Sequence, residues 1–94
     1  MIKSFADKET EKLYISGRTT KLPSTIIKSA LRKLDYLNSA TYINDLRIPL
    51  GNKLELLKGK HKDKYSIRIN NQFRIVFGFY RSNAYDVEII DYHK

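Results

Sequence analysis

The chain has 94 residues and no cysteine. It therefore cannot form a disulfide framework or a thiolate metal site, which fits a cytoplasmic protein. Its two histidines, His61 and His93, are too few for a histidine-based metal site unless carboxylates contribute. A glycine-rich phosphate loop and a nucleophile elbow are also missing. We expect neither a metal nor another cofactor.

Long hydrophobic runs are absent as well. No apolar run approaches the ~20 residues that cross a bilayer. The first residues, MIKSFADKE, carry recurring charges where a signal peptide would be hydrophobic. A hydrophobic content of 41% is enough for one compact core. We expect a single domain, residues 1–94, in the cytoplasm.

Negative charge is scarce. Ten Asp and Glu residues face 18 Lys and Arg residues, and the formal net charge is +8. On so small a domain this charge favours an anionic partner: nucleic acid first, an acidic protein second, a membrane surface third. No basic amphipathic helix is apparent, so the membrane is the weakest of the three.

The clearest pattern that is present is YSIRINNQFRIVF, residues 65–77. Apolar and polar residues alternate on each side of an Asn-Asn break, which predicts a β-hairpin. Centring the turn on Asn71 gives one wholly apolar face, as register selection requires. That register pairs Tyr65 with Phe77, Ile67 with Ile75, Ile69 with Phe73, and Arg68 with Arg74.

The two arginines are directly opposed in this register. Like charges in that position destabilise a strand pair, so Arg68 and Arg74 favour an anion between them, and phosphate fits best. The alternative is that both side chains are spread into solvent.

The rest of the chain predicts an α+β domain with two helices on one face of a small antiparallel sheet. Asp7 can cap a helix that ends at Gly17. A second helix has Lys28, Arg32 and Lys33 off its apolar stripe, on a solvated face. The expected elements are a short strand (1–5), helices (7–16 and 23–38), a packed connector (39–52), a short strand (53–57), a basic loop (58–64), the hairpin and a last strand (85–92).

Several groups are predicted to converge at one end of the uncovered face. Centring the second turn on Ser82 places Phe79 opposite Tyr85 and Arg74 opposite Ile90. Tyr92 then lies diagonally from Arg74, ~7–8 Å away. The other members of this set are Arg68, the loop lysines Lys58, Lys60, Lys62 and Lys64, the carboxylates Glu55 and Asp91, and His93.

This set suits the cleavage of RNA by its own 2′-hydroxyl. The reaction needs a base, an acid and cations that stabilise the charged phosphorane, and an aromatic ring can stack on an unpaired base. Glu55, Asp91 and His93 all remain candidates for the base. Tyr92 could instead be a packed strand end. Two other functions stay open, which are a non-catalytic RNA- or ribosome-binding module and an interaction protein for an acidic partner.

Three motifs occur in one order: GNKLELLKGK (residues 51–60), YSIRINNQFRIVF, and AYDVEIIDYH (residues 84–93). With the start MIKSF and the residues 45–47, they resemble the HigB group of the RelE-type toxins over essentially the whole chain. The resemblance implies a RelE-like fold and a ribosome-dependent endoribonuclease that cuts mRNA in the decoding site. It also implies a helix-turn-helix antitoxin as partner.

The resemblance further implies roles for individual residues. Arg68 and Arg74 would hold the scissile phosphate with help from Lys58, and Asp91, Tyr92 and His93 would form a C-terminal catalytic motif. Some members have a histidine where this chain has Glu55, so the general base stays open.

Overall fold

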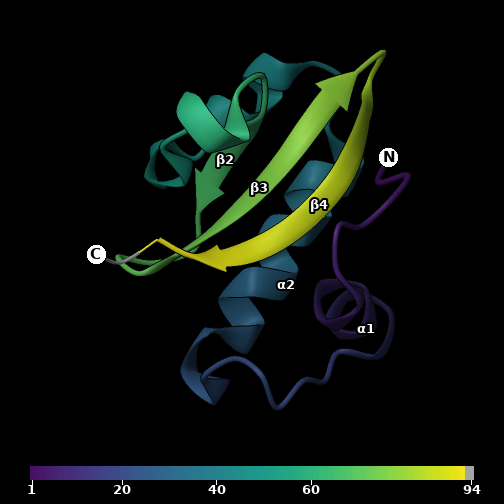
Figure 1. The fold of residues 1–94 in the computed structure, drawn as a ribbon, viewed down its shortest axis with the longest axis vertical. Helices are drawn as coiled ribbons and strands as arrows, with labels where there is room; N and C mark the ends of the chain where they lie inside the picture. Colours follow the sequence, from purple (N-terminus) through teal and green to yellow (C-terminus); the bar gives the residue numbers. More distant parts are fainter. Residues whose placement is uncertain (93–94) are drawn as a thin grey trace.

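Two α-helices lie behind a four-stranded antiparallel sheet in the computed structural model, which describes residues 1–92 (Figure 1). His93, a predicted site residue, lies outside the described residues. The sheet order is β1-β2-β3-β4, so each strand pairs with its neighbours in sequence. The elements are α1 (Lys8–Ser16), α2 (Ser24–Ser39), β1 (Glu55–Leu56), β2 (Tyr65–Arg68), β3 (Phe73–Tyr80) and β4 (Asn83–Asp91), with 3₁₀ turns at Ile43–Arg47, Leu50–Asn52 and Gly59–His61.

The helices begin and end where their local signals predict. The Asp7 side chain accepts a hydrogen bond from the Thr10 backbone N–H at 3.4 Å, and Gly17 ends α1 with a φ of 76°. A left-handed residue at that position satisfies the last carbonyls of a helix at little steric cost to glycine. Along α2, the stripe of apolar side chains at helical spacing is buried against the sheet: Ile26, Ala30, Leu34 and Leu37.

The first hairpin has the predicted register. Tyr65 pairs with Phe77, Ile67 with Ile75, and Arg68 with Arg74. Ile67, Ile75 and Phe77 are fully buried in the core beneath the helices. Because side chains alternate across a strand, the same register sends Arg68 and Arg74 to the other face.

The second hairpin differs from the prediction near its turn. Gly78, not Phe79, lies opposite Tyr85, because the loop is two residues long. Both loop residues, Arg81 and Ser82, have positive φ, which is typical of a tight two-residue turn. A β-bulge then adds one residue to β4, and beyond it Arg74 lies opposite Ile90 as predicted.

Residues 1–5 pair with β4 at only two points, so the predicted first strand is not a regular one. Ile2 and Phe5 form isolated parallel bridges with Ala84 and Val87. The bulge separates these two bridges, since Asp86 lies between them with a φ of 52°. The bulge distorts the β4 backbone between the two bridges, so no continuous ladder forms there.

The sheet face away from the helices is less open than predicted. Ser66 and Val76, which lie on it, are fully buried, and Leu57 is 8% exposed. Figure 1 shows the short turn at Gly59–His61 in front of the sheet, on the side away from α2. The irregular residues around β1 thus cover part of the face that carries Arg74.

Candidate functional site

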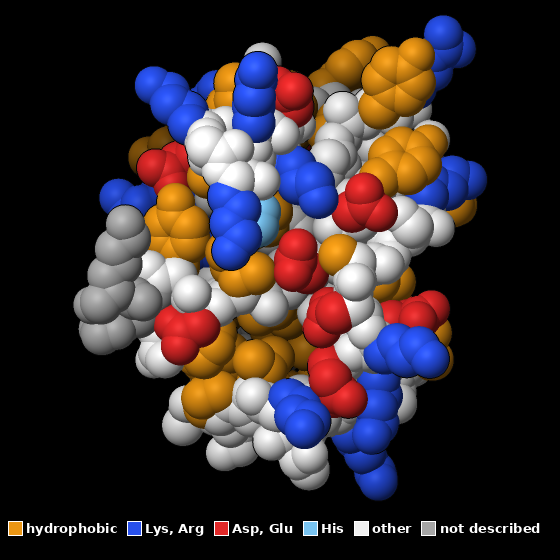
Figure 2. All heavy atoms as spheres, in the orientation of Figure 1, with side chains coloured by type: hydrophobic (Ala, Val, Ile, Leu, Met, Phe, Trp, Pro, Cys, Tyr) orange, Lys and Arg blue, Asp and Glu red, His pale blue; other side chains and the backbone are white. Residues whose placement is uncertain are grey.

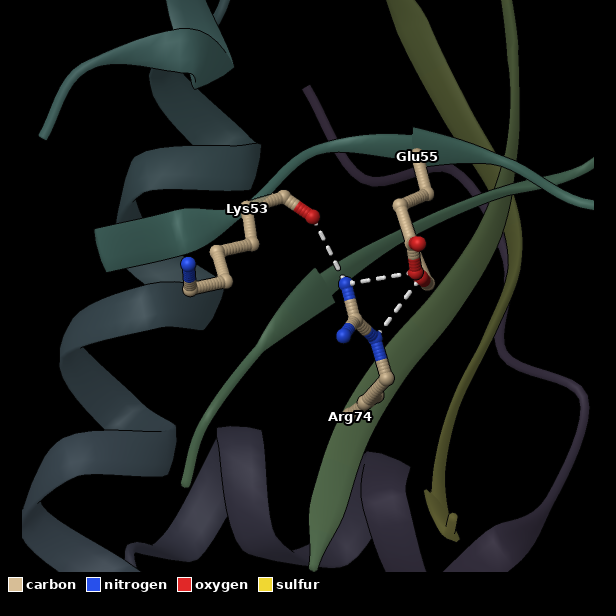
Figure 3. Close-up of polar contacts among 4 residues, drawn as sticks. Lys53, Glu55 and Arg74 are labelled. Carbon is tan, nitrogen blue, oxygen red and sulfur yellow. Dashed lines mark hydrogen bonds and ion pairs between the residues drawn. The ribbon is translucent and has the colours of Figure 1, made fainter. Parts of the chain in front are cut away.

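Arg74 is the central cation of this covered face. Its side chain is only 10% exposed. Nε donates to Ser66 Oγ at 2.8 Å, Nη2 donates to the Lys53 carbonyl at 2.7 Å, and Nη2 lies 3.2 Å from Glu55 Oε1 (Figure 3). A buried charge is tolerated only when it is paired and hydrogen-bonded. These three contacts therefore fix the guanidinium in one orientation.

Tyr92 lies against the same guanidinium, as the register predicted. Its ring centroid is 5.4 Å from Arg74 Cζ, within cation–π range. The Tyr92 backbone N–H donates to the Gln72 carbonyl, which holds the end of β4 beside the first hairpin. The side chain remains 42% exposed, so one ring face can still meet another planar group.

Arg68 lies opposite Arg74 but has a different environment. It is half-buried, and its Nη2 donates to Asn71 Oδ1 in the adjacent turn. Arg74 instead reaches across β2 toward β1. The two cations thus turn to different partners, which relieves the repulsion that their pairing would otherwise cause.

The basic loop is separated from Arg68, although the prediction placed the two together. Lys64 precedes β2, while Arg68 ends it, so ~13 Å of strand separates them. Lys58, Lys60 and Lys62 are exposed, and Lys64 is half-buried. A backbone hydrogen bond of 2.7 Å between Leu57 N–H and the Lys64 carbonyl closes the loop.

The two predicted carboxylates lie on opposite faces of the sheet. Glu55 is opposite Ser66 on β1, 53% exposed, and in contact with Arg74. Asp91 is opposite Phe73, on the helix-covered side, and accepts a hydrogen bond from Gln72 Nε2 at 3.1 Å. The predicted placement of Asp91 beside the arginines is therefore wrong, whereas Glu55 lies where it was expected.

A hollow of about 420 Å³ opens beside Asp91. Figure 2 shows it as a recessed hydrophobic area with acidic side chains around it. Three carboxylates and one lysine line it, in a chain whose overall charge is +8, so it does not suit a phosphate. Its lining residues are Asp7, Glu9, Thr10, Lys21, Leu22, Phe73, Ile89 and Asp91.

Sequence reasoning missed two polar groups of this region. Ser66 is one of the polar residues in the alternating pattern of the hairpin, which predicts an outward side chain, yet it is fully buried against Arg74. Lys33 was placed on the solvated face of α2, yet it is 5% exposed and donates to Asn52 Oδ1. Burial lowers the pKa of Lys33 below 10.5, and the nearby charges of Arg32 and Arg68 lower it further. The spacing of residues along α2 cannot show that the connector (residues 39–52) folds over Lys33 and buries it.

Within residues 1–92, no group of three or more histidines and carboxylates is placed to hold a metal ion. In the same part of the chain, no helix is long and apolar enough to cross a membrane.

Comparison with known families bears on this arrangement. Residues 3–93 match the sequence profile described as the RelE-like toxin of type II toxin–antitoxin system HigB. The chain belongs to this family. Toxin HigB-1 of Vibrio cholerae is 42% identical over 78 residues, 82% of each chain. The Endoribonuclease HigB of Proteus vulgaris is 33% identical over 93 residues, 99% of this chain and 100% of the relative. The resemblance inferred from the three motifs is thus confirmed.

Solved structures support the fold of this HigB-like toxin. The YoeB-YefM complex from Staphylococcus aureus contains a chain that aligns with a TM-score of 0.62 at 19% identity, covering 100% of this chain and 99% of that one. A heterotetrameric YoeB-YefM complex from the same organism aligns with a TM-score of 0.57 at 17% identity and the same coverage. The predicted α+β fold, with two helices on an antiparallel sheet, is confirmed.

Proposed function

We propose that this HigB-like toxin is an endoribonuclease that cuts mRNA on the ribosome without a metal ion. The observation that carries the proposal is the orientation of the Arg74 guanidinium. Contacts with Ser66, Lys53 and Glu55 hold it in place, and the Tyr92 ring lies beside it. Catalysis of phosphate transfer rests largely on cations that are oriented before the charge develops. The name of the Proteus vulgaris relative, Endoribonuclease HigB, supports the same activity.

In the proposed reaction, the 2′-oxygen of one nucleotide attacks the adjacent phosphorus and the bond to the 5′-oxygen breaks. The products are a 2′,3′-cyclic phosphate and a 5′-hydroxyl. The described contacts of Arg74 use Nε and Nη2, so Nη1 is the group that we propose binds a phosphate oxygen. Arg68 adds a second positive charge from the paired strand.

Glu55 is the general base in this proposal. It is half exposed, it lies on the same face as Arg74, and a carboxylate can take the 2′-hydroxyl proton. Asp91 is on the opposite face. We therefore propose a structural role for it, in which it accepts a hydrogen bond from Gln72 and holds the turn between β2 and β3 against the end of β4. His93, which follows Tyr92 in the C-terminal motif, would protonate the leaving 5′-oxygen.

Binding to the ribosome would depend on the exposed lysines of the basic loop. Lys58, Lys60 and Lys62 offer positive charges that can replace the counterions of ribosomal RNA. In the cytoplasm, where translation takes place, a helix-turn-helix antitoxin would neutralise the toxin. Membership of a type II toxin–antitoxin family supports a protein partner of this kind.

The decisive experiment is primer extension on a message translated by purified ribosomes with the toxin added. New RNA ends that need both ribosome and toxin are expected, together with growth arrest when the toxin is expressed without antitoxin. Intact message and normal growth would overturn the proposal.

A non-catalytic RNA- or ribosome-binding module is the second candidate. One observation favours it, because Glu55 already neutralises Arg74 in the free protein. This candidate predicts salt-sensitive binding with a linear log–log slope and no new RNA ends. The same primer-extension experiment therefore separates the two functions.

A further inference from the structure

Ser66 occupies the point where the Arg74 side chain crosses β2. In register, Ser66 lies between Glu55 on β1 and Val76 on β3. Arg74 starts from β3, and its guanidinium contacts Lys53 and Glu55 at the β1 side. Neighbouring strands are ~4.8 Å apart, so the side chain must reach past β2 to contact these groups. On the way its Nε lies 2.8 Å from Ser66 Oγ.

Two physical demands meet at this position. The side chain must be small, because Ser66 is 0% exposed and a bulky group would fill the path of the guanidinium. It must also accept a hydrogen bond, because Arg74 Nε points at it from 2.8 Å in a buried setting. An apolar replacement would leave that charged donor without its acceptor, which is costly in a low-dielectric site.

We propose that Ser66 is a positioning residue that sets the rotation of the Arg74 guanidinium. The Lys53 carbonyl and Glu55 both contact Nη2, at one corner of the planar group. These two contacts hold the outer end of the guanidinium, and the contact at Nε holds the end nearest the side-chain stem. The direction of Nη1, and with it the place of the phosphate, then depends on the hydroxyl of Ser66 together with these two acceptors. This role rests on the proposed ribonuclease function.

Four variants test the role. Ser66→Ala removes the acceptor and keeps the space. Ser66→Thr and Ser66→Val have nearly the same shape and differ in the hydroxyl, so their comparison isolates the hydrogen bond. Ser29→Ala is the matched control, because Ser29 also accepts from an arginine, Arg32 Nη2 at 3.3 Å, but on the exposed surface of α2.

Single-turnover cleavage on ribosomes should fall about tenfold or more in Ser66→Ala, with ribosome affinity unchanged. Ser66→Thr should cleave faster than Ser66→Val, and Ser29→Ala should match the wild type. Equal rates for Ser66→Ala and wild type, or for the Thr and Val variants, would overturn the proposal. So would a loss of ribosome affinity that accounts for the whole effect.

A second readout does not depend on activity. In ¹H–¹⁵N NMR spectra of the free toxin, the Arg74 Nε–H signal should be protected from solvent exchange in wild type and Ser66→Thr. It should exchange faster in Ser66→Ala and Ser66→Val. If the wild type cuts no RNA but its signal behaves in this way, the proposed function fails while the positioning of Arg74 stands. Unchanged protection in Ser66→Ala refutes the positioning itself.

Discussion

Arg68 and Arg74 are opposed in the sheet, yet their surroundings differ sharply. Arg74 is buried, and its partners come from three separate segments of the chain: Ser66 on β2, Lys53 and Glu55 at β1, and Tyr92 after β4. Arg68 is half-buried, and its hydrogen-bond partner, Asn71, is three residues away. The difference indicates a division of roles, in which one cation is fixed by the fold and the other can adjust to a ligand.

The largest effect should come from Arg74→Ala. Cleavage should fall ~100-fold or more, and the free energy of unfolding by about 1–3 kcal/mol, because buried groups lose their charged partner. Urea denaturation and primer extension measure the two quantities. Arg74→Lys is the control, since it keeps the charge without the planar fork and should lose activity too. Full activity in Arg74→Lys would show that charge alone is sufficient.

Arg68→Ala should separate activity from stability. We expect cleavage to fall by tenfold or more while the free energy of unfolding changes by only about 0.5 kcal/mol, because the side chain has few fixed contacts. The same two assays apply. A loss of stability as large as that of Arg74→Ala would contradict the contrast between the two arginines.

The two carboxylates extend the comparison to the two faces of the sheet. Glu55→Gln should slow cleavage about tenfold or more, because the amide cannot take the 2′-hydroxyl proton. Asp91→Asn is the matched change on the helix-covered face, and we expect its cleavage rate to stay within a few-fold of the wild type. The reverse ranking in single-turnover assays would assign the base to Asp91.

Lys33 is a second buried cation, and its partner is the neutral amide of Asn52. Its effect on stability should be smaller than that of Arg74 and should depend on pH. Burial lowers the pKa of Lys33 in the folded state. At pH values between that pKa and 10.5, the unfolded state therefore binds more protons than the folded state. Stability should therefore rise with pH across this window relative to Lys33→Met. Urea denaturation of both proteins at several alkaline pH values measures the difference. If the free energy of unfolding of the wild type fell with rising pH relative to that of Lys33→Met, the lowering of the Lys33 pKa by burial would be refuted.

The sequence predicted those parts of the fold that depend on local periodicity. The two helices and the register of the first hairpin follow from apolar spacing and from caps such as Asp7 and Gly17. The bulge near Asp86 was missed, because one extra residue in β4 leaves the alternation near Arg74 intact and changes only the pairing near the turn.

The candidate site was less accessible to the same reasoning. The burial of Arg74 depends on tertiary packing by the residues around β1, which the prediction of a short strand at 53–57 did not indicate. Strand alternation puts Asp91 on the side of Ile89, whereas the prediction grouped it with the arginines as a nearby carboxylate. Family motifs indicate which residues act, whereas the alternation of a strand decides which of them share a face.

The turn at Arg81 and Ser82 has a practical consequence for these experiments. Ser82 has a φ of 66°, a conformation that glycine adopts without strain. Ser82→Gly should raise the free energy of unfolding by about 0.5–1 kcal/mol, because the relieved left-handed strain exceeds the cost of a more flexible unfolded chain, as thermal denaturation would show. The turn lies at the opposite end of β3 from Arg74. A toxin with that change would provide a more robust parent protein, in which even the damaging Arg74 variants could be purified and assayed.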